Sequence, residues 1–107
     1  MEVTDITVFD AGELEEMVKN RDIRISKALV DTVLNNLKGR KRHIHALSIY
    51  VENEQTIYDI TLDRQEFLTT LRENLKTLET NELFEECAEV VKAIKVLEKK
   101  ELKTTKK

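Results

Sequence analysis

Among the side chains that most often carry out catalysis or hold a metal ion, this 107-residue chain contains one cysteine and two histidines, and its 21 Asp and Glu residues fall in predicted capping or solvent positions. Cys87 together with His43 or His45 is the one combination that could form a nucleophile and its base. Cys87, however, lies on the apolar face of a predicted helix, where a small buried side chain is expected. The two histidines share one face of a predicted strand, but a closed metal site needs two further ligands. We therefore expect no metal ion, no cofactor and no enzymatic activity.

A cluster of positive charge, Arg40, Lys41 and Arg42, suggests a second kind of chemistry. Such clusters attract the phosphates of nucleic acids, and Arg21 and Arg24 lie upstream. The chain as a whole is acidic, with a net charge of -3 and a pI of about 5.5, whereas dedicated nucleic-acid binders usually carry a basic excess. The cluster also suits the C-terminal end of a helix, where positive charge is favourable. Nucleic-acid binding through Arg40, Lys41 and Arg42 is therefore the alternative hypothesis.

The length of 107 residues indicates a single domain, and the composition indicates how its core is built. Charged residues make up 36% of the chain and aromatic residues 5%, with no Trp, so the core must be built from Leu, Ile and Val. One cysteine cannot form an intrachain disulfide, no apolar run approaches the roughly 18–20 residues of a membrane span, and no signal-peptide pattern opens the sequence. We expect one domain over residues 1–102, a frayed basic tail over residues 103–107, no membrane association and a cytoplasmic location.

Three segments have the alternating, β-branched pattern of strands: residues 3–9, 43–52 and 56–62. The last two are predicted to form a β-hairpin around Asn53-Glu54. The register that separates apolar from polar residues pairs Glu52 with Gln55, Ile49 with Tyr58, Leu47 with Ile60, His45 with Leu62 and Ser48 with Asp59. We expect these strands to form a small antiparallel sheet.

Four helices are predicted to pack on this sheet, giving an α+β fold. Asp10 and Asp63 each have the features of an N-cap, with a glutamate three residues later, and are predicted to begin the first and third helices. The second helix follows a connector over residues 21–25, begins at Ser26 and ends near Gly39, which is expected in the left-handed conformation.

The third and fourth helices are predicted to form an antiparallel hairpin that turns at Thr80-Asn81, and this hairpin is the strongest candidate for a functional surface. The fourth helix carries an inner apolar stripe that includes Leu83 and Cys87. Phe84 is predicted to project beside that stripe, where a partner could bind it as an anchor. The predicted partner-binding residues are Glu82, Phe84, Glu85, Glu86 and Glu89.

Two short runs in this hairpin match a known pattern: Phe84-Glu85-Glu86-Cys87-Ala88 and Ile94-Lys95-Val96-Leu97-Glu98. With them, the segment from Leu71 to Glu98 resembles the UVR motif, the helical hairpin of bacterial excision-repair subunits and of some Clp-associated regulators. Val91-Lys92 stand where that family usually has an Arg-Asp pair. The resemblance implies protein–protein contact through pairing with a like hairpin. The arrangement from Leu47 to Leu97 is also similar to small accessory proteins of tailed phages.

The sequence therefore predicts a non-enzymatic protein–protein interaction module, or a regulatory accessory protein, that docks through its C-terminal helical hairpin. The expected partner is another protein, and homo-oligomerisation through the hairpin is compatible with either hypothesis. The two hypotheses differ in salt dependence, because binding to phosphates weakens steeply with added salt whereas hydrophobic docking does not.

Overall fold

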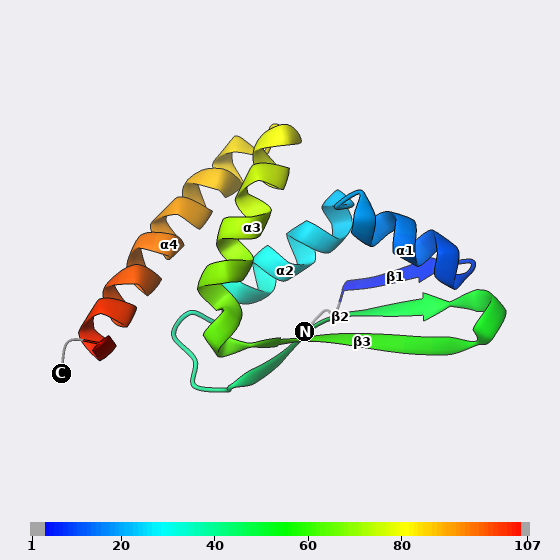
Figure 1. Ribbon diagram of the computed structural model, residues 1–107, viewed down its shortest axis with the longest axis horizontal. Coiled ribbons are helices and arrows are strands. Elements are labelled where there is room, and N and C mark those ends of the chain that lie inside the picture. The colour runs from blue at the N-terminus through cyan, green and yellow to red at the C-terminus, as the bar shows by residue number, and fades with distance from the viewer. Residues whose placement is uncertain (1–3, 106–107) are drawn as a thin grey trace.

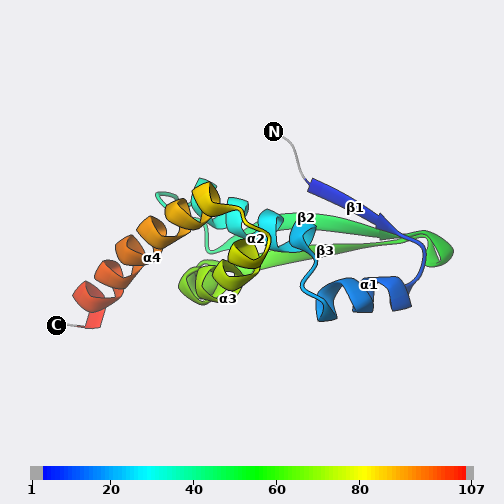
Figure 2. The same cartoon turned by 90° about the horizontal axis from the view of Figure 1, so that it is seen from above.

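The computed structural model describes residues 4–105, with the side chains of residues 6–100. The elements in chain order are β1 (Thr4–Val8), α1 (Ala11–Lys19), α2 (Ile23–Asn35), β2 (His43–Val51), β3 (Thr56–Asp63), α3 (Phe67–Thr80) and α4 (Phe84–Thr105). Helices α1 and α2 lie over one face of a three-stranded sheet, and the α3–α4 hairpin stands at one end of the molecule (Figures 1 and 2). The predicted α+β class and the C-terminal helical hairpin are confirmed. Within the described range, none of the helices has both the length and the apolar character of a membrane span.

The sheet is mixed, so the predicted antiparallel arrangement holds for β2 and β3 but not for β1. The strand order is β1-β2-β3, and β1 runs parallel to β2, with Thr4 opposite Leu47 and Val8 opposite Val51. Parallel neighbours need a long crossover connection, and α1 and α2 together provide it. Alternating apolar residues reveal a strand but not its direction, which is why the sequence did not predict this pairing.

The register of the β-hairpin confirms three predicted pairs: Ile49 with Tyr58, Leu47 with Ile60 and Ser48 with Asp59. The predicted pair of His45 with Leu62 is wrong, because His45 lies opposite Thr61. The predicted pair of Glu52 with Gln55 lies outside the ladder, in the turn, where the Gln55 N–H donates to the Glu52 carbonyl at 3.1 Å. A β-bulge between His45 and Leu47 inserts one extra residue into β2. The pairing of the residues that precede the bulge is therefore shifted by one position. As a result Ala46 and Leu47, although adjacent, are both buried.

The N-cap of α1 is confirmed at Asp10. The Asp10 carboxylate accepts a hydrogen bond from the Glu13 N–H at 2.8 Å, and the Glu13 carboxylate accepts one from the Phe9 N–H at 2.6 Å. The second predicted cap, Asp63, also accepts from the main chain two residues later, but it caps a 3₁₀ turn, Arg64–Glu66, rather than α3. Helix α3 therefore begins at Phe67, later than predicted. At the other end of the hairpin α4 continues to Thr105, past the predicted end at residue 102, and residues 106–107 lie outside the described range.

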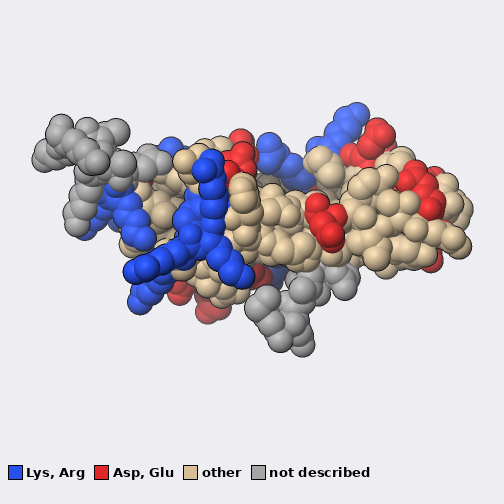
Figure 3. All heavy atoms as spheres, turned by 90° about the horizontal axis from the view of Figure 1, so that it is seen from below, with Lys and Arg blue, Asp and Glu red and all other residues tan. Residues whose placement is uncertain are grey.

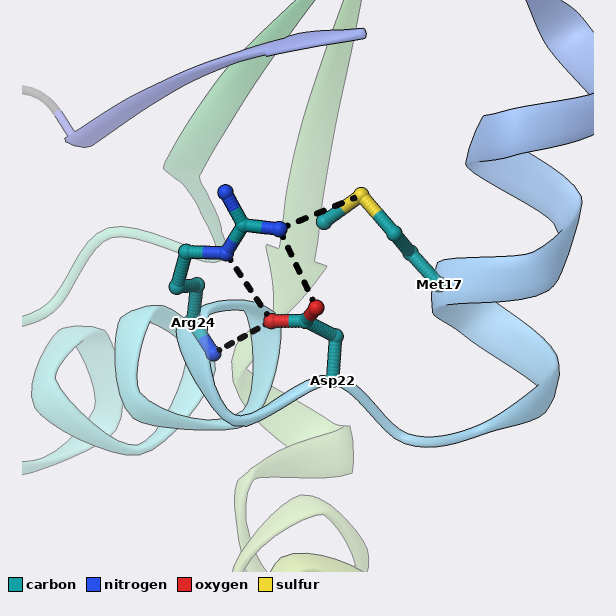
Figure 4. Close-up of polar contacts among 3 residues, drawn as sticks. All are labelled: Met17, Asp22 and Arg24. Atoms are coloured by element: carbon teal, nitrogen blue, oxygen red, sulfur yellow. Dashed lines mark hydrogen bonds and ion pairs between the residues drawn. The ribbon is translucent and has the colours of Figure 1, made fainter.

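Helix α2 begins at Ile23, with Asp22 as its N-cap, so the predicted connector over residues 21–25 and the predicted cap Ser26 are wrong. The Asp22 carboxylate accepts a hydrogen bond from the Arg24 N–H at 2.9 Å and binds the Arg24 guanidinium through both oxygens at 3.1 Å (Figure 4). The same guanidinium reaches the sulfur of Met17 at 3.7 Å. Ser26 is instead a buried residue inside the helix. A charged pair two residues apart thus fixes the corner between α1 and α2.

The end of α1 has an unusual residue in the left-handed conformation, Arg21, with a φ of 52°. Its N–H donates to the Val18 carbonyl and the following N–H of Asp22 donates to the Met17 carbonyl, the two bonds of a Schellman motif. Glycine is the usual residue at this position, because a Cβ atom there is sterically unfavourable.

We predict that Arg21→Gly raises the free energy of unfolding by about 0.5–1 kcal/mol, because relief of the left-handed strain outweighs the entropy that glycine adds to the unfolded chain. Urea denaturation at neutral pH would measure the difference. Arg21→Ala is the matched control, since it removes the same side chain and keeps the Cβ atom. Equal stability of the two variants would contradict the prediction.

The core lies between the sheet and α2 and continues between α2, α3 and α4 (Figure 1). It is built mainly from Leu, Ile and Val, as predicted, and also contains Phe67, Met17, Cys87, Ala28, Ala46 and Ala93. The largest fully buried side chains are Phe67, Leu47, Ile49, Leu71, Leu78, Val8, Val30, Val33, Val51 and Val90. Four of these side chains, Phe67, Leu71, Leu78 and Val90, belong to α3 and α4 and hold the hairpin against the rest of the domain.

Candidate docking surface

The turn between α3 and α4 repeats the motif found at Arg21. Glu82 has a φ of 59°, its N–H donates to the Glu79 carbonyl, and the N–H of Leu83 donates to the Leu78 carbonyl. These bonds satisfy the last carbonyl groups of α3 and reverse the chain within three residues, Asn81 to Leu83. The reversal lies one residue beyond the predicted Thr80-Asn81 and brings Phe84 onto the first turn of α4.

Phe84 is 65% exposed, the highest value among the large apolar side chains of the described residues. The residues that follow it on the inner face of α4, Cys87 and Val90, are buried against the core. Burial raises the pKa of the Cys87 thiol, so this cysteine is held in the neutral form and has the environment of a packing residue. The inner and outer faces of α4 are therefore clearly separated at its first turns.

The predicted acidic residues do not all have the same role. Glu82, Glu85 and Glu89 are exposed. Glu86 instead forms an ion pair with Lys27 of α2, with 3.1 Å between the ammonium nitrogen and one carboxylate oxygen. Because this pair joins α2 to α4, Glu86 contributes to the position of the hairpin.

Two further exposed residues, Ala88 and Val91, extend the candidate surface beyond the predicted set. They follow Phe84 at i+4 and i+7, positions that share one face of a helix. Val91 is 39% exposed. We call Phe84, Ala88 and Val91 the docking strip. Sequence reasoning missed its last two members, although the same spacing rule that located the inner stripe could have found them.

The basic residues of the alternative hypothesis lie on the loop between α2 and β2. Arg64 organises this loop: its side chain donates to the Asn36 carbonyl at 2.7 Å and to the Lys41 carbonyl at 2.6 Å, and its guanidinium lies 4.9 Å from the centre of the Phe67 ring. Gly39 is not left-handed, contrary to the prediction, and α2 ends four residues before it. A Cβ atom on Gly39 would lie 3.1 Å from Arg64, so glycine instead permits the close approach of the loop to this side chain.

Helix α4 lies next to the loop that carries the exposed residues Arg40, Lys41 and Arg42. Lys100 donates to the Leu37 carbonyl at 3.4 Å, and Figure 3 shows Lys and Arg side chains gathered over the loop and the adjoining part of α4. Arg42 is partly neutralised, since it lies 3.2 Å from the Asp63 carboxylate. We call Arg40, Lys41 and Arg42 the basic loop. Arg21 and Arg24, which the alternative hypothesis added to this cluster, do not lie near the basic loop, because they are at the opposite end of α2.

Three polar side chains meet on the uncovered face of the sheet, His45, Ser48 and Asp59. The Ser48 hydroxyl donates to the Asp59 carboxylate at 2.6 Å, and the His45 Nε2 atom lies 2.9 Å from the Ser48 oxygen and 3.4 Å from Asp59. A serine nucleophile needs its carboxylate on the other imidazole nitrogen, so this geometry does not match a catalytic triad. It is a cross-strand polar cluster. Within the described residues, no three His, Cys, Asp or Glu side chains gather in a way that could hold a metal ion.

Among the side chains that the structure describes, three carboxylates are stabilised in their charged form. The pKa of Asp22 is lowered by hydrogen bonds from the Arg24 side chain, that of Asp59 by the Ser48 hydroxyl, and that of Asp63 by the Gln65 N–H. Asp31 is the opposite case, since burial raises its pKa. Groups with a lowered pKa bind fewer protons in the folded state, so they stabilise the fold above the ordinary value of 3.8 and lose that contribution as the pH falls.

We predict that Asp22→Asn is less stable than the natural chain at pH 7 and that the difference shrinks toward zero as the pH falls below about 4. Asparagine keeps the N-cap, so the variant removes only the charge. Urea denaturation at several pH values measures the difference. A difference that stays constant down to pH 2 would show that the charge of Asp22 contributes nothing.

Comparisons with known proteins add no relative. A scan against models of protein families, a search of curated proteins and a search of solved structures each found no match.

Proposed function

We propose that this protein is a docking module that binds a partner protein through α4 of its C-terminal hairpin. The observation that carries the proposal is the exposure of Phe84 on a helix that the rest of the domain holds firmly in place. Exposing a phenylalanine ring to water costs free energy that burial in a partner recovers, and aromatic anchors in central pockets dominate many interfaces. Ala88 and Val91 extend the apolar contact along the same face of the helix.

The chemistry around the docking strip defines the partner surface. Glu82, Glu85 and Glu89 are exposed beside it and make its rim acidic. The complementary surface is an apolar groove or helix face with Lys or Arg at its rim, because charges of opposite sign steer the encounter and fix its register. A helical segment of the partner suits the straight strip, and the resemblance to the UVR hairpin supports this choice.

The basic loop supports a second candidate function, binding to nucleic acid. The specific observation in its favour is that α4 brings Lys100 to the loop that carries Arg40, Lys41 and Arg42. A site of this kind binds phosphates. Its affinity falls as salt is added, and it falls more steeply when more phosphates are contacted. The net charge of -3 makes it the weaker of the two candidates.

The test that separates the candidates is an affinity capture with the tagged protein from extracts of the cells that produce it, with and without nuclease, followed by mass spectrometry. We expect one protein to be captured in equal yield under both conditions and equally well by the double variant Arg40→Ala/Lys41→Ala. Capture that disappears with nuclease and with the double variant would overturn the docking proposal and assign the function to the basic loop.

A further inference from the structure

The outer edge of β3 presents unpaired main-chain groups. β3 pairs with β2 on one side, and no strand among the described residues pairs with its other side. The N–H of Arg64 donates to the Arg42 carbonyl at 2.6 Å, so the main-chain groups of Arg64 face β2. Since main-chain groups alternate along a strand, those of Ile57, Asp59 and Thr61 point away from β2. They form a row of hydrogen-bonding groups available to another strand.

β3 has little of the usual protection of an edge strand. Natural edges are blunted by short length, charged side chains (Lys above all), Pro or a bulge, and of these β3 carries only the carboxylates of Asp59 and Asp63. β3 runs for eight residues, contains neither Lys nor Pro, and the bulge of the sheet lies in β2. Two of its apolar side chains are also left open, with Ile57 62% and Tyr58 44% exposed. The part of the sheet visible in Figure 3 is mostly uncharged.

We propose that β3 pairs antiparallel with β3 of a second copy of the chain, about a twofold axis at Ile60, so that two three-stranded sheets become one continuous sheet. A twofold interface uses the same surface of both copies, and an antiparallel strand pair has this symmetry. The inference is independent of the proposed function, because the docking strip and β3 are different surfaces.

The charges on β3 select the register. With the axis at Ile60, Asp59 lies opposite Thr61 of the second copy and Ile57 lies opposite Asp63, so no two carboxylates are directly opposite each other. An axis at Asp59 would place two carboxylates in direct opposition, which is destabilising. The register at Ile60 also pairs the outward-pointing main-chain groups of Asp59 and Thr61 with each other.

In the same register, side chains of the second copy pack against the exposed apolar side chains on the helix-facing side of β3. Tyr58 lies opposite Leu62 of the second copy, and the two Ile60 side chains face each other across the axis. Ile60 is half-buried in one copy, so dimerisation removes further apolar surface from water. A single strand pair buries less than the roughly 1,200 Å² of a standard stable interface, so we expect a dimer that dissociates on dilution.

Disulfide trapping tests the register. In a Cys87→Ala background, Ile60→Cys places two thiols in a non-hydrogen-bonded pair, whose Cα atoms are about 4.5 Å apart and within disulfide range. Asp59→Cys is the matched control, since its neighbour across the axis is Thr61. We expect a covalent dimer on mild oxidation with cysteine at position 60 and little with cysteine at position 59. Equal trapping at both positions would overturn the proposal.

Sedimentation of the uncrosslinked protein gives the second readout. Thr61→Pro removes an N–H that points away from β2, so it should abolish association and leave the circular dichroism spectrum of the fold unchanged. Thr61→Ala keeps that N–H and should still dimerise. A natural chain that stays monomeric at its highest soluble concentration, or a proline variant that still dimerises, would overturn the proposal.

Discussion

Replacing Phe84 by alanine is expected to weaken partner binding by at least about 30-fold in Kd, which corresponds to the roughly 2 kcal/mol that defines a hot-spot residue. The free energy of unfolding should change by less than about 0.5 kcal/mol, because the ring is 65% exposed and alanine favours a helix. Titration of the captured partner, combined with urea denaturation of the variant, measures both quantities. Large loss of binding with intact stability is the pattern of a docking residue.

The chain offers a matched control for this substitution. Phe9 is 62% exposed and follows β1, far along the chain from α4. Phe9→Ala therefore removes the same side chain with nearly the same exposure and should leave partner binding unchanged. If Phe84→Ala lowers stability strongly while the folded fraction binds normally, Phe84 is a packing residue and the proposal fails.

Replacing Phe67 by alanine is expected to cost about 3–5 kcal/mol of folding free energy, the range for removal of a buried aromatic ring. Phe67 is 1% exposed, begins α3 and packs in the core, and its ring supports the Arg64 guanidinium that holds the basic loop. Since small domains are commonly stable by only about 5–15 kcal/mol, the variant should lose a large fraction of its total stability.

Thermal and urea denaturation of Phe67→Ala beside Phe9→Ala measure this effect, with the exposed phenylalanine as the control for side-chain type. Phe67→Leu should lose less, because most of the buried volume is kept. A loss below about 1 kcal/mol for Phe67→Ala would contradict the placement of this ring in the core.

The sequence predicted the parts of the fold that depend on local chemistry. The cap at Asp10 and the hairpin register over residues 47–49 follow from side chains close in sequence. The parallel partner of β1 could not be predicted, because strand direction depends on contacts between distant segments. The start of α2 was missed because Asp22 and Ser26 are both favourable N-cap residue types, and the hydrogen bonds between Asp22 and Arg24 that place the cap at Asp22 are seen only in the folded chain.

The left-handed residues that end α1 and α3 escaped prediction for one shared reason. Arg21 and Glu82 adopt the left-handed conformation that usually signals glycine, whereas Gly39, where the signal was expected, does not. At the candidate site, the exposure of Phe84 followed from its place beside the inner stripe of α4. The ion pair of Glu86 with Lys27 did not, because it joins residues from separate helices.

The most direct test of the docking strip is photo-crosslinking in the cells that produce the protein. A photoreactive phenylalanine analogue would replace Phe84 in one variant and Phe9 in another, so that both probes occupy exposed phenylalanine positions. Docking through α4 predicts one cross-linked partner protein from position 84 and none from position 9. Absence of any protein cross-link at position 84, or the same products from both positions, would contradict it.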